Sequence, residues 1–203
     1  MKALFSTAYF PPVAYLAALS RHDGDRLFEL YETFPKQTYR NRAVIMTAGG
    51  LRNLTVPVVR TNHSRTGEVK IDDKTPWRTI HLRTIEAAYA ASPYYMFYRD
   101  EMVALLTNGY EYLYELDREA TRWVLRKLSL SDSYETTTDW IASTGGTDDY
   151  RNRFSPKVPY PTETMPPYYQ VFSDRLPFAP NLSILDPLFN LGPEAGEYLK
   201  KVT

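Results

Sequence analysis

The chain contains no cysteine among its 203 residues. This absence excludes disulfide bonds, thiolate nucleophiles and thiolate metal ligands, so stability must come from packing. No apolar run approaches the roughly 18 residues of a membrane-spanning helix, and the apolar N-terminus meets Ser6 and Thr7 too soon for the core of a signal peptide. We therefore predict a cytoplasmic protein without a membrane span.

Several motifs of common enzyme classes are also missing. The sequence has no Gly-x-Ser-x-Gly, no Walker loop, no Gly-x-Gly-x-x-Gly and no His-x-x-x-His. The sequence therefore predicts neither a cofactor nor a metal site. The formal net charge is zero and no nucleic-acid-binding module is recognisable, which argues against nucleic acid as a partner.

The composition indicates one packed domain that spans residues 1–203. Hydrophobic residues make up 43% of the chain, and 17 Tyr, 9 Phe and 3 Trp argue against disorder. No linker-like stretch divides the chain into two self-sufficient halves. Residues 145–167 are polar and punctuated by proline, so we expect a long loop there, as a lid or a mobile segment.

The N-terminal pattern predicts a βαβ unit. A strand over 3–8 leads into a helix that begins at Pro12 and continues to residue 20, and a second strand covers 27–31 after the turn at 22–25. Ligands of α/β proteins bind at the carboxyl ends of parallel strands. We expect Tyr9, Glu32 and Lys36 to gather at that end.

The remaining pattern completes an α/β fold with a mixed sheet and three or more helices. Paired glycines at 49 and 50 predict a hairpin between the runs 43–47 and 51–59, added to the sheet in antiparallel fashion. Further strands are expected at 68–71, 136–142 and 168–172, and helices at 76–91, 98–106, 111–128 and 187–201, the last interrupted at Gly192-Pro193.

Positive charge is concentrated in one third of the chain. From Lys36 to Lys70 there are seven lysines and arginines and one acid, Glu68. In an extended backbone Arg40 and Arg42 would share a face, with Asn41 opposite, and could form a two-pronged clamp on phosphate or carboxylate. A solvated basic face, or a structural ion pair with Glu29, Glu32 or Asp186, explains the same residues equally well.

Catalytic and contact residues can be proposed beside this cluster. His81 is the best acid/base candidate because it lies on a predicted helix one turn from Trp77, although a lone helical histidine is more often structural. We pair Glu32 with it as the catalytic carboxylate. Further candidates for contact with a ligand are aromatic or polar side chains: Tyr9, Tyr39, Trp77, Gln170, Asn181 and Asp186. Some of them also have a purely structural explanation, such as a capping box formed by Ser183 and Asp186.

Several blocks together resemble the WbqC-like proteins of bacteria. They are Tyr9-Phe10-Pro11, the segment 36–42, residues 54–58, residues 77–89, residues 169–172 and residues 180–186. Members of that family occur in O-antigen gene clusters, and a glycine or aminoacyl transferase role has been proposed for some. The resemblance departs at Phe5-Ser6-Thr7, where many members have His-Gln-Pro, so this chain would need another base for a reaction that uses that histidine.

Two functional hypotheses follow from these observations. The first is a transferase-like enzyme that holds a small anionic or activated donor, carrying an aminoacyl or glycosyl group, in surface polysaccharide biosynthesis. The second is a non-catalytic ligand-binding or scaffold protein whose exposed aromatics and 145–167 loop contact a partner. The sequence predicts no oligomeric state.

Overall fold

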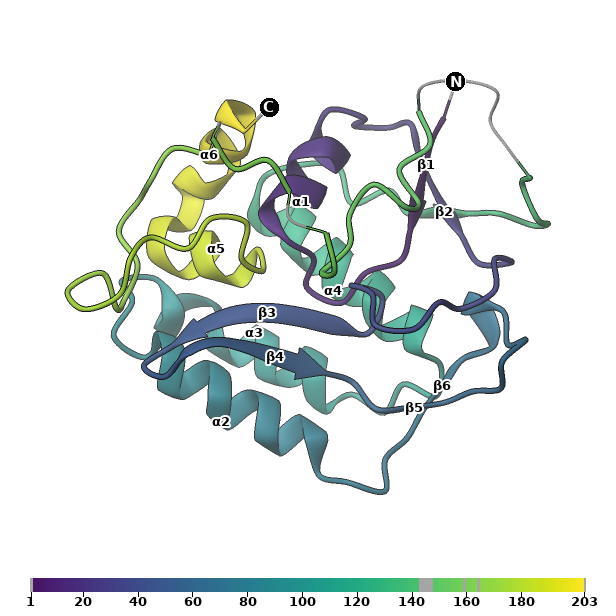
Figure 1. The fold of residues 1–203 in the computed structure, drawn as a ribbon, viewed down its shortest axis with the longest axis horizontal. Coiled ribbons are helices and arrows are strands. Elements are labelled where there is room, and N and C mark those ends of the chain that lie inside the picture. The colour runs from purple at the N-terminus through teal and green to yellow at the C-terminus, as the bar shows by residue number, and fades with distance from the viewer. Residues whose placement is uncertain (1, 143–147, 159, 164, 203) are drawn as a thin grey trace.

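The computed structural model describes residues 2–142, 148–158, 160–163 and 165–202. It begins with the predicted βαβ unit, formed by β1 (Ala3–Ser6), α1 (Val13–Ser20) and β2 (Arg26–Glu29). β1 and β2 pair in parallel, and the short strand β7 (Glu135–Thr136) pairs with β2 in the same direction. The carboxyl ends of these three strands therefore lie at one edge of the sheet, and Figure 1 shows β1 and β2 side by side.

The helix α1 lies in the interior of the protein. Val13 to Leu19 are all buried, and the helix packs against the C-terminal helix α6 (Ala195–Lys201). A helix that is apolar on every side needs partners all around it. This explains why the short run after Pro12 contains so few polar residues.

The predicted hairpin is present as β3 (Arg42–Thr47) and β4 (Gly50–Thr55). Gly50 has a φ of 97°, a conformation in which glycine avoids the strain of a side chain. The predicted run 51–59 is broken at Pro57, and β5 (Val58–Val59) pairs with β6 (Lys70–Ile71) after the 3-10 turn η1 (Thr66–Glu68). Contrary to expectation, the hairpin forms its own two-stranded sheet and does not join the parallel one.

Helices support the hairpin from below. α2 (Trp77–Tyr89) runs beneath β3 and β4, with α3 (Tyr95–Thr107) beside it and α4 (Leu113–Lys127) behind (Figure 1). α2 buries Trp77, His81, Ile85, Ala88 and Tyr89, as its apolar stripes predict. No helix in the described part of the chain is long and apolar enough to cross a membrane.

The C-terminal third differs most from expectation. The predicted strand 168–172 is not a strand; Gln170 instead bonds to Ala179 through its side chain, with the Nε2 group donating to the carbonyl and the Oε1 atom accepting from the amide. The strand predicted over 136–142 ends at Thr136. The helical close is confirmed as α5 (Leu185–Leu191), the 3-10 turn η2 (Gly192–Glu194) and α6.

Gly192 ends α5 in a left-handed conformation and lies against an aromatic ring. Its φ is 58°, and a Cβ atom built at this position would lie 2.5 Å from the Tyr94 ring. We expect Gly192→Ala to lower the free energy of unfolding by at least about 2 kcal/mol. Alanine would be strained at this backbone conformation, and its Cβ atom would overlap the Tyr94 ring. Gly109→Ala, where a Cβ meets nothing within 4 Å, is the matched control. Urea unfolding of both variants measures the difference, and equal stabilities would contradict this packing.

Candidate functional site

A groove of about 560 Å³ lies between the hairpin and residues 155–162. We call it the hairpin groove. Its first wall is the outer face of the hairpin, where Arg42 and Val44 of β3 lie on the same side as Leu51 and Asn53 of β4. Arg52 also borders the groove, although its pairing with the buried Ile45 places its side chain on the other face.

The second wall is fixed by a column of aromatic rings. The Phe5 ring in the core stacks on Tyr150 with centroids 4.7 Å apart, Tyr150 stacks on Phe154 at 6.3 Å, and Phe154 stacks on Tyr160 at 5.7 Å. Tyr160 reaches the groove. The described part of the predicted 145–167 loop is therefore anchored to the sheet, and its residues 145–147, 159 and 164 lie outside the described residues.

The floor joins the groove to the start of α1. Asn181 has a φ of 55°, and its Oδ1 atom accepts a hydrogen bond of 2.9 Å from the Ala14 amide in the first turn of that helix. The Ser183 amide donates to the Val44 carbonyl at 2.7 Å. Residues 181–183 thus tie the βαβ unit to the hairpin at the bottom of the groove.

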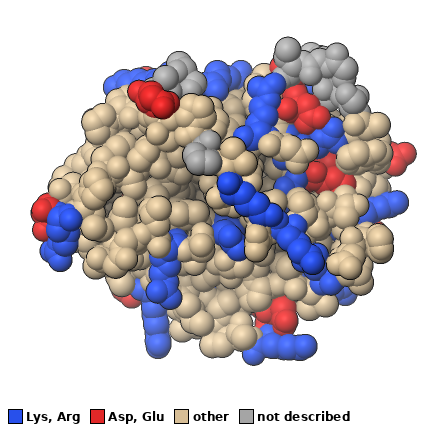
Figure 2. All heavy atoms as spheres, in the orientation of Figure 1, with Lys and Arg blue, Asp and Glu red and all other residues tan. Residues whose placement is uncertain are grey.

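The hairpin groove is electropositive. Arg42 and Arg52 border it, and none of its described lining residues is acidic. Arg42 forms no ion pair with any described residue, and its Nε atom is buried without a hydrogen-bond partner there. In Figure 2 basic side chains run across the middle of this face, while acidic ones lie toward its edges and upper right. An unpaired guanidinium in such a place suits an anion.

One end of the groove is aromatic. A smaller hollow of about 380 Å³ shares Tyr39, Ser155 and Tyr160 with it and adds Phe154. Burial raises the pKa of Tyr39, so its phenol stays neutral at pH 7 and can donate a hydrogen bond. This end therefore offers ring surfaces, and Arg153 also lines it.

Arg40 does not share this groove with Arg42. It is buried, and its Nε and one terminal nitrogen donate to a single oxygen of Glu32 at 2.8 and 2.5 Å. The pKa of Glu32 is nevertheless raised, because desolvation by burial outweighs the attraction of Arg40. The structural ion pair considered as an alternative is therefore present, and the two arginines do not act as a clamp.

The predicted catalytic histidine is also enclosed. His81 lies beside Trp77, and its Nδ1 atom is 3.0 Å from the hydroxyl of Tyr9. Burial lowers the pKa of His81 to about 4, so the ring is neutral at pH 7; its other polar contact is the backbone of Thr55. We assign Nδ1 as the acceptor of the Tyr9 proton. Neither residue lines the hairpin groove.

The remaining candidates take separate positions. Lys36 is exposed in the loop before β3, and Asn41 donates from Nδ2 to the Val56 carbonyl at 2.9 Å. Asp186 does not form the expected capping box. Its carboxylate is buried and accepts hydrogen bonds from the hydroxyls of Tyr89 and Tyr168 at 2.9 and 2.6 Å, and from Gln170 at 3.0 Å. Of the predicted contact residues, the groove brings together Tyr39, Arg42 and Asn181.

Sequence reasoning missed a second buried ionic cluster. The Glu29 carboxylate, at the end of β2, accepts from the amide of Tyr31 at 2.7 Å and from the hydroxyl of Thr137 at 3.0 Å, and it faces Arg151 at 3.5 Å. Arg151 also pairs with Asp149 at 2.5 Å. Glu29 lies more than 100 positions from Thr137 and from Arg151, so no local signal identifies this cluster. Among the described residues no group of three or more His, Asp or Glu could hold a metal ion.

Asp117 of α4 is a further buried acid, and it was not among the candidates from the sequence. It is fully buried, and both carboxyl oxygens, like the hydroxyls of Thr7 and Tyr134, lack a well-formed hydrogen bond among the described residues. Desolvation raises the pKa of Asp117 well above its usual range. Burial therefore favours the protonated, neutral form of this carboxyl group.

The Glu32–Arg40 pair gives a first prediction for this site. Arg40→Gln leaves a buried carboxylate unpartnered and is expected to lower the free energy of unfolding by about 3 to 5 kcal/mol. Adding Glu32→Gln should recover part of that loss, because two neutral amides can bond to each other. Urea unfolding of the single and double variants measures both steps; a double variant no more stable than Arg40→Gln would contradict the pairing.

Asp117 gives a prediction about pH. Because its pKa is raised in the folded state, the unfolded chain releases this proton at a lower pH than the folded one, and Asp117 lowers stability increasingly as pH rises above about 4. Asp117→Asn, which mimics the protonated acid, should remove that decline and be at least as stable as the wild type at pH 7. Unfolding midpoints between pH 4 and 8 test this, and parallel profiles for the two proteins would refute it.

Comparison with known proteins identifies the family. The profile of the WbqC-like protein family matches residues 7–153. A protein of Mycobacterium tuberculosis named "Uncharacterized protein Rv1507c" is 24% identical over 225 residues, covering 98% of this chain and 96% of that protein. No solved structure matches significantly. Since the profile covers well over half of the chain, the protein belongs to the WbqC-like protein family.

Proposed function

We propose that the protein binds a small ligand with a phosphate or carboxylate group in the hairpin groove. The observation behind this proposal is the guanidinium of Arg42, which has no ion-pair partner among the described residues and lines a groove whose described lining contains no acid. Arginine is normally paired or solvated, and its planar fork matches phosphate and carboxylate oxygens. An anion placed beside Arg42 meets no repulsion from the lining.

The rest of the lining provides uncharged polar groups. Asn53, Ser155 and Thr162 offer an amide and two hydroxyls, which can bond to neutral parts of a ligand. The amide nitrogen of Asn181 is also available, because its Oδ1 atom is the one used on α1. Rings of a ligand would lie toward Tyr39 and Tyr160. This arrangement fits a molecule with an anionic group and a ring, such as a nucleotide or a nucleotide-linked sugar.

Transfer of an aminoacyl or glycosyl group in surface polysaccharide biosynthesis is the narrower candidate. Activated donors of this type contain phosphate, so the groove suits the donor, and the family resemblance implies the same class. The described lining holds no histidine or carboxylate, however, and His81 and Glu32 lie in the interior. General acid or base catalysis would therefore have to come from the ligands or from a phenol such as that of Tyr39.

A non-catalytic scaffold is the competing function. That function needs exposed aromatics and the 145–167 loop to contact a partner. Exposed rings such as Phe97 are present, but the described part of the loop packs through Arg151 and the aromatic column. Exposed Leu51 and Val158 stand beside the groove, where they can shield a bound molecule from water. These placements favour a small-molecule ligand over a protein partner.

Thermal-shift and calorimetric titrations test the proposal. The probes are inorganic phosphate, pyrophosphate, uridine diphosphate and, as the neutral reference, uridine. Arg42→Gln is expected to reduce affinity for the phosphate-bearing probes by about 10- to 100-fold, the equivalent of one charge-assisted interaction, while the ligand-free Tm changes little. Uridine alone should bind weakly to both proteins.

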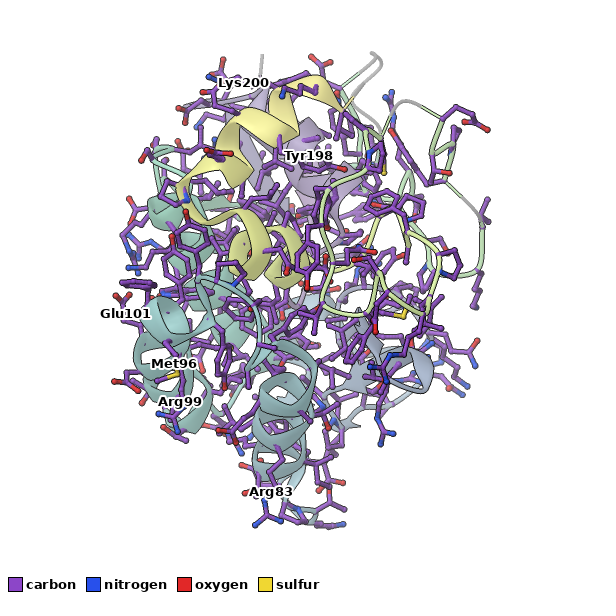
Figure 3. All side chains as sticks on the ribbon, turned by 90° about the vertical axis from the view of Figure 1, so that its left-hand side faces the viewer. Arg83, Met96, Arg99, Glu101, Tyr198 and Lys200 are labelled. Carbon is purple, nitrogen blue, oxygen red and sulfur yellow. The ribbon has the colours of Figure 1, made fainter. Side chains whose placement is uncertain are left out.

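Arg83→Gln is the matched control. Arg83 is exposed on α2, at the bottom of the view in Figure 3, and does not line the groove. This variant should bind the phosphate-bearing probes like the wild type. If no probe shifts the wild type, or if Arg42→Gln and Arg83→Gln respond equally, the groove is not an anion site.

A further inference from the structure

A second hollow, of about 320 Å³, lies at the carboxyl ends of β2 and β7. We call it the β2–β7 hollow. Leu30 and Tyr31 follow β2 directly, and Thr137 and Thr138 follow β7 directly. Open parallel sheets bind their ligands at this edge, because the loops that leave the strands diverge there. The hollow shares no residue with the hairpin groove.

The wall of this hollow consists mainly of aromatic and hydroxyl groups. Tyr31 and Tyr114 contribute rings, and Thr136 and Thr138 contribute hydroxyls. None of these four hydroxyls has a side-chain hydrogen bond to another described residue. They are therefore available both to donate to and to accept from a bound molecule.

The floor, in contrast, is fully bonded. The Thr137 hydroxyl accepts from the Leu30 amide at 3.2 Å and donates to Glu29 at 3.0 Å, and the Tyr31 amide donates to the same carboxylate at 2.7 Å. One buried carboxylate thus holds the ends of β2 and β7 together beneath the hollow. The polar groups above it are preorganised, which reduces the entropy lost on binding.

The charge of the hollow is balanced. Arg65 and Glu68 both line it, and Glu68 accepts a hydrogen bond from the Arg65 amide at 3.2 Å. The Arg65 guanidinium lies over the Tyr31 ring, 5.3 Å from its centre, where the π-electrons already stabilise its charge. The lining thus carries one cation and one acid, whereas the described lining of the hairpin groove carries cations alone.

We propose that the β2–β7 hollow binds a single neutral sugar ring. A sugar presents hydroxyls at its edge, which match the free hydroxyls of Tyr31, Tyr114, Thr136 and Thr138, and C–H groups on its faces, which pack on tyrosine rings. The volume suits one ring and is near the lower limit for ligand pockets. An anion beside Arg65 would also meet the carboxylate of Glu68, and a purely apolar ligand would leave the hydroxyls unbonded.

Saturation-transfer NMR and chemical-shift titrations of the full chain test this proposal. The panel contains glucose, galactose, rhamnose and N-acetylglucosamine, with inorganic phosphate as the charged reference. At least one sugar should bind the wild type saturably. The Tyr31→Phe, Tyr114→Phe double variant, which keeps both rings, should weaken that binding by at least about fivefold, as expected for two lost hydrogen bonds.

Two controls separate this site from the hairpin groove. Tyr169→Phe removes a hydroxyl from an exposed tyrosine outside the hollow and should bind the sugar normally. Arg42→Gln should also bind it normally, so a failure of the groove proposal leaves this one standing. Absence of saturable binding by every sugar, unchanged binding by the double variant, or loss of binding in Arg42→Gln would each overturn the assignment.

Discussion

Glu32 and Arg40 form an ion pair in the interior, and both walls of the hairpin groove depend on its position. A buried charge must be paired, so the backbone around residue 40 has little freedom. Tyr39 directly precedes Arg40, and Arg42 begins β3 two residues after it. The Glu32–Arg40 ion pair therefore fixes the positions at which Tyr39 and Arg42 line the groove. Arg40 also approaches the carbonyl of Arg151 at 3.5 Å, close to the start of the second wall. A charge that plays no direct part in the groove thus determines its geometry.

Local patterns in the sequence predicted most of the helices and the hairpin. Proline at the start of α1, the glycine turn at Gly50 and the apolar stripes of α2 each depend on nearby residues, and each appears where expected. The roles of Arg40 and Arg42 could not be predicted in the same way. The clamp assumed an extended backbone, but residues 36–41 form turns and bends, and Arg40 points inward. The charge of a side chain is known from the sequence, but whether that side chain is buried depends on contacts between distant residues. Glu29 and Arg151, for example, are in contact although they lie 122 positions apart.

The two hollows differ in chemistry although both belong to one small protein. The groove beside the hairpin has an unopposed cation and aromatic surfaces, while the hollow at the sheet edge has balanced charge and free hydroxyls. The interior groups that resemble a catalytic set, His81 with Tyr9 and the buried Asp117, are sealed from both. Their shifted pKa values follow from desolvation, which acts on any buried titratable group. A shifted pKa alone therefore does not identify a functional residue in this fold.

The aromatic column has an evolutionary consequence. Between β7 and α5 the described backbone contains no helix and no strand, so this stretch takes its shape from side-chain anchors such as Tyr150 and Phe154. The family match ends at residue 153, just before the segment that faces the hairpin. The lining positions that follow, from Ser155 to Thr162, belong to no helix or strand among the described residues. Substitutions there can change the shape of the opening while the strands and helices stay in place.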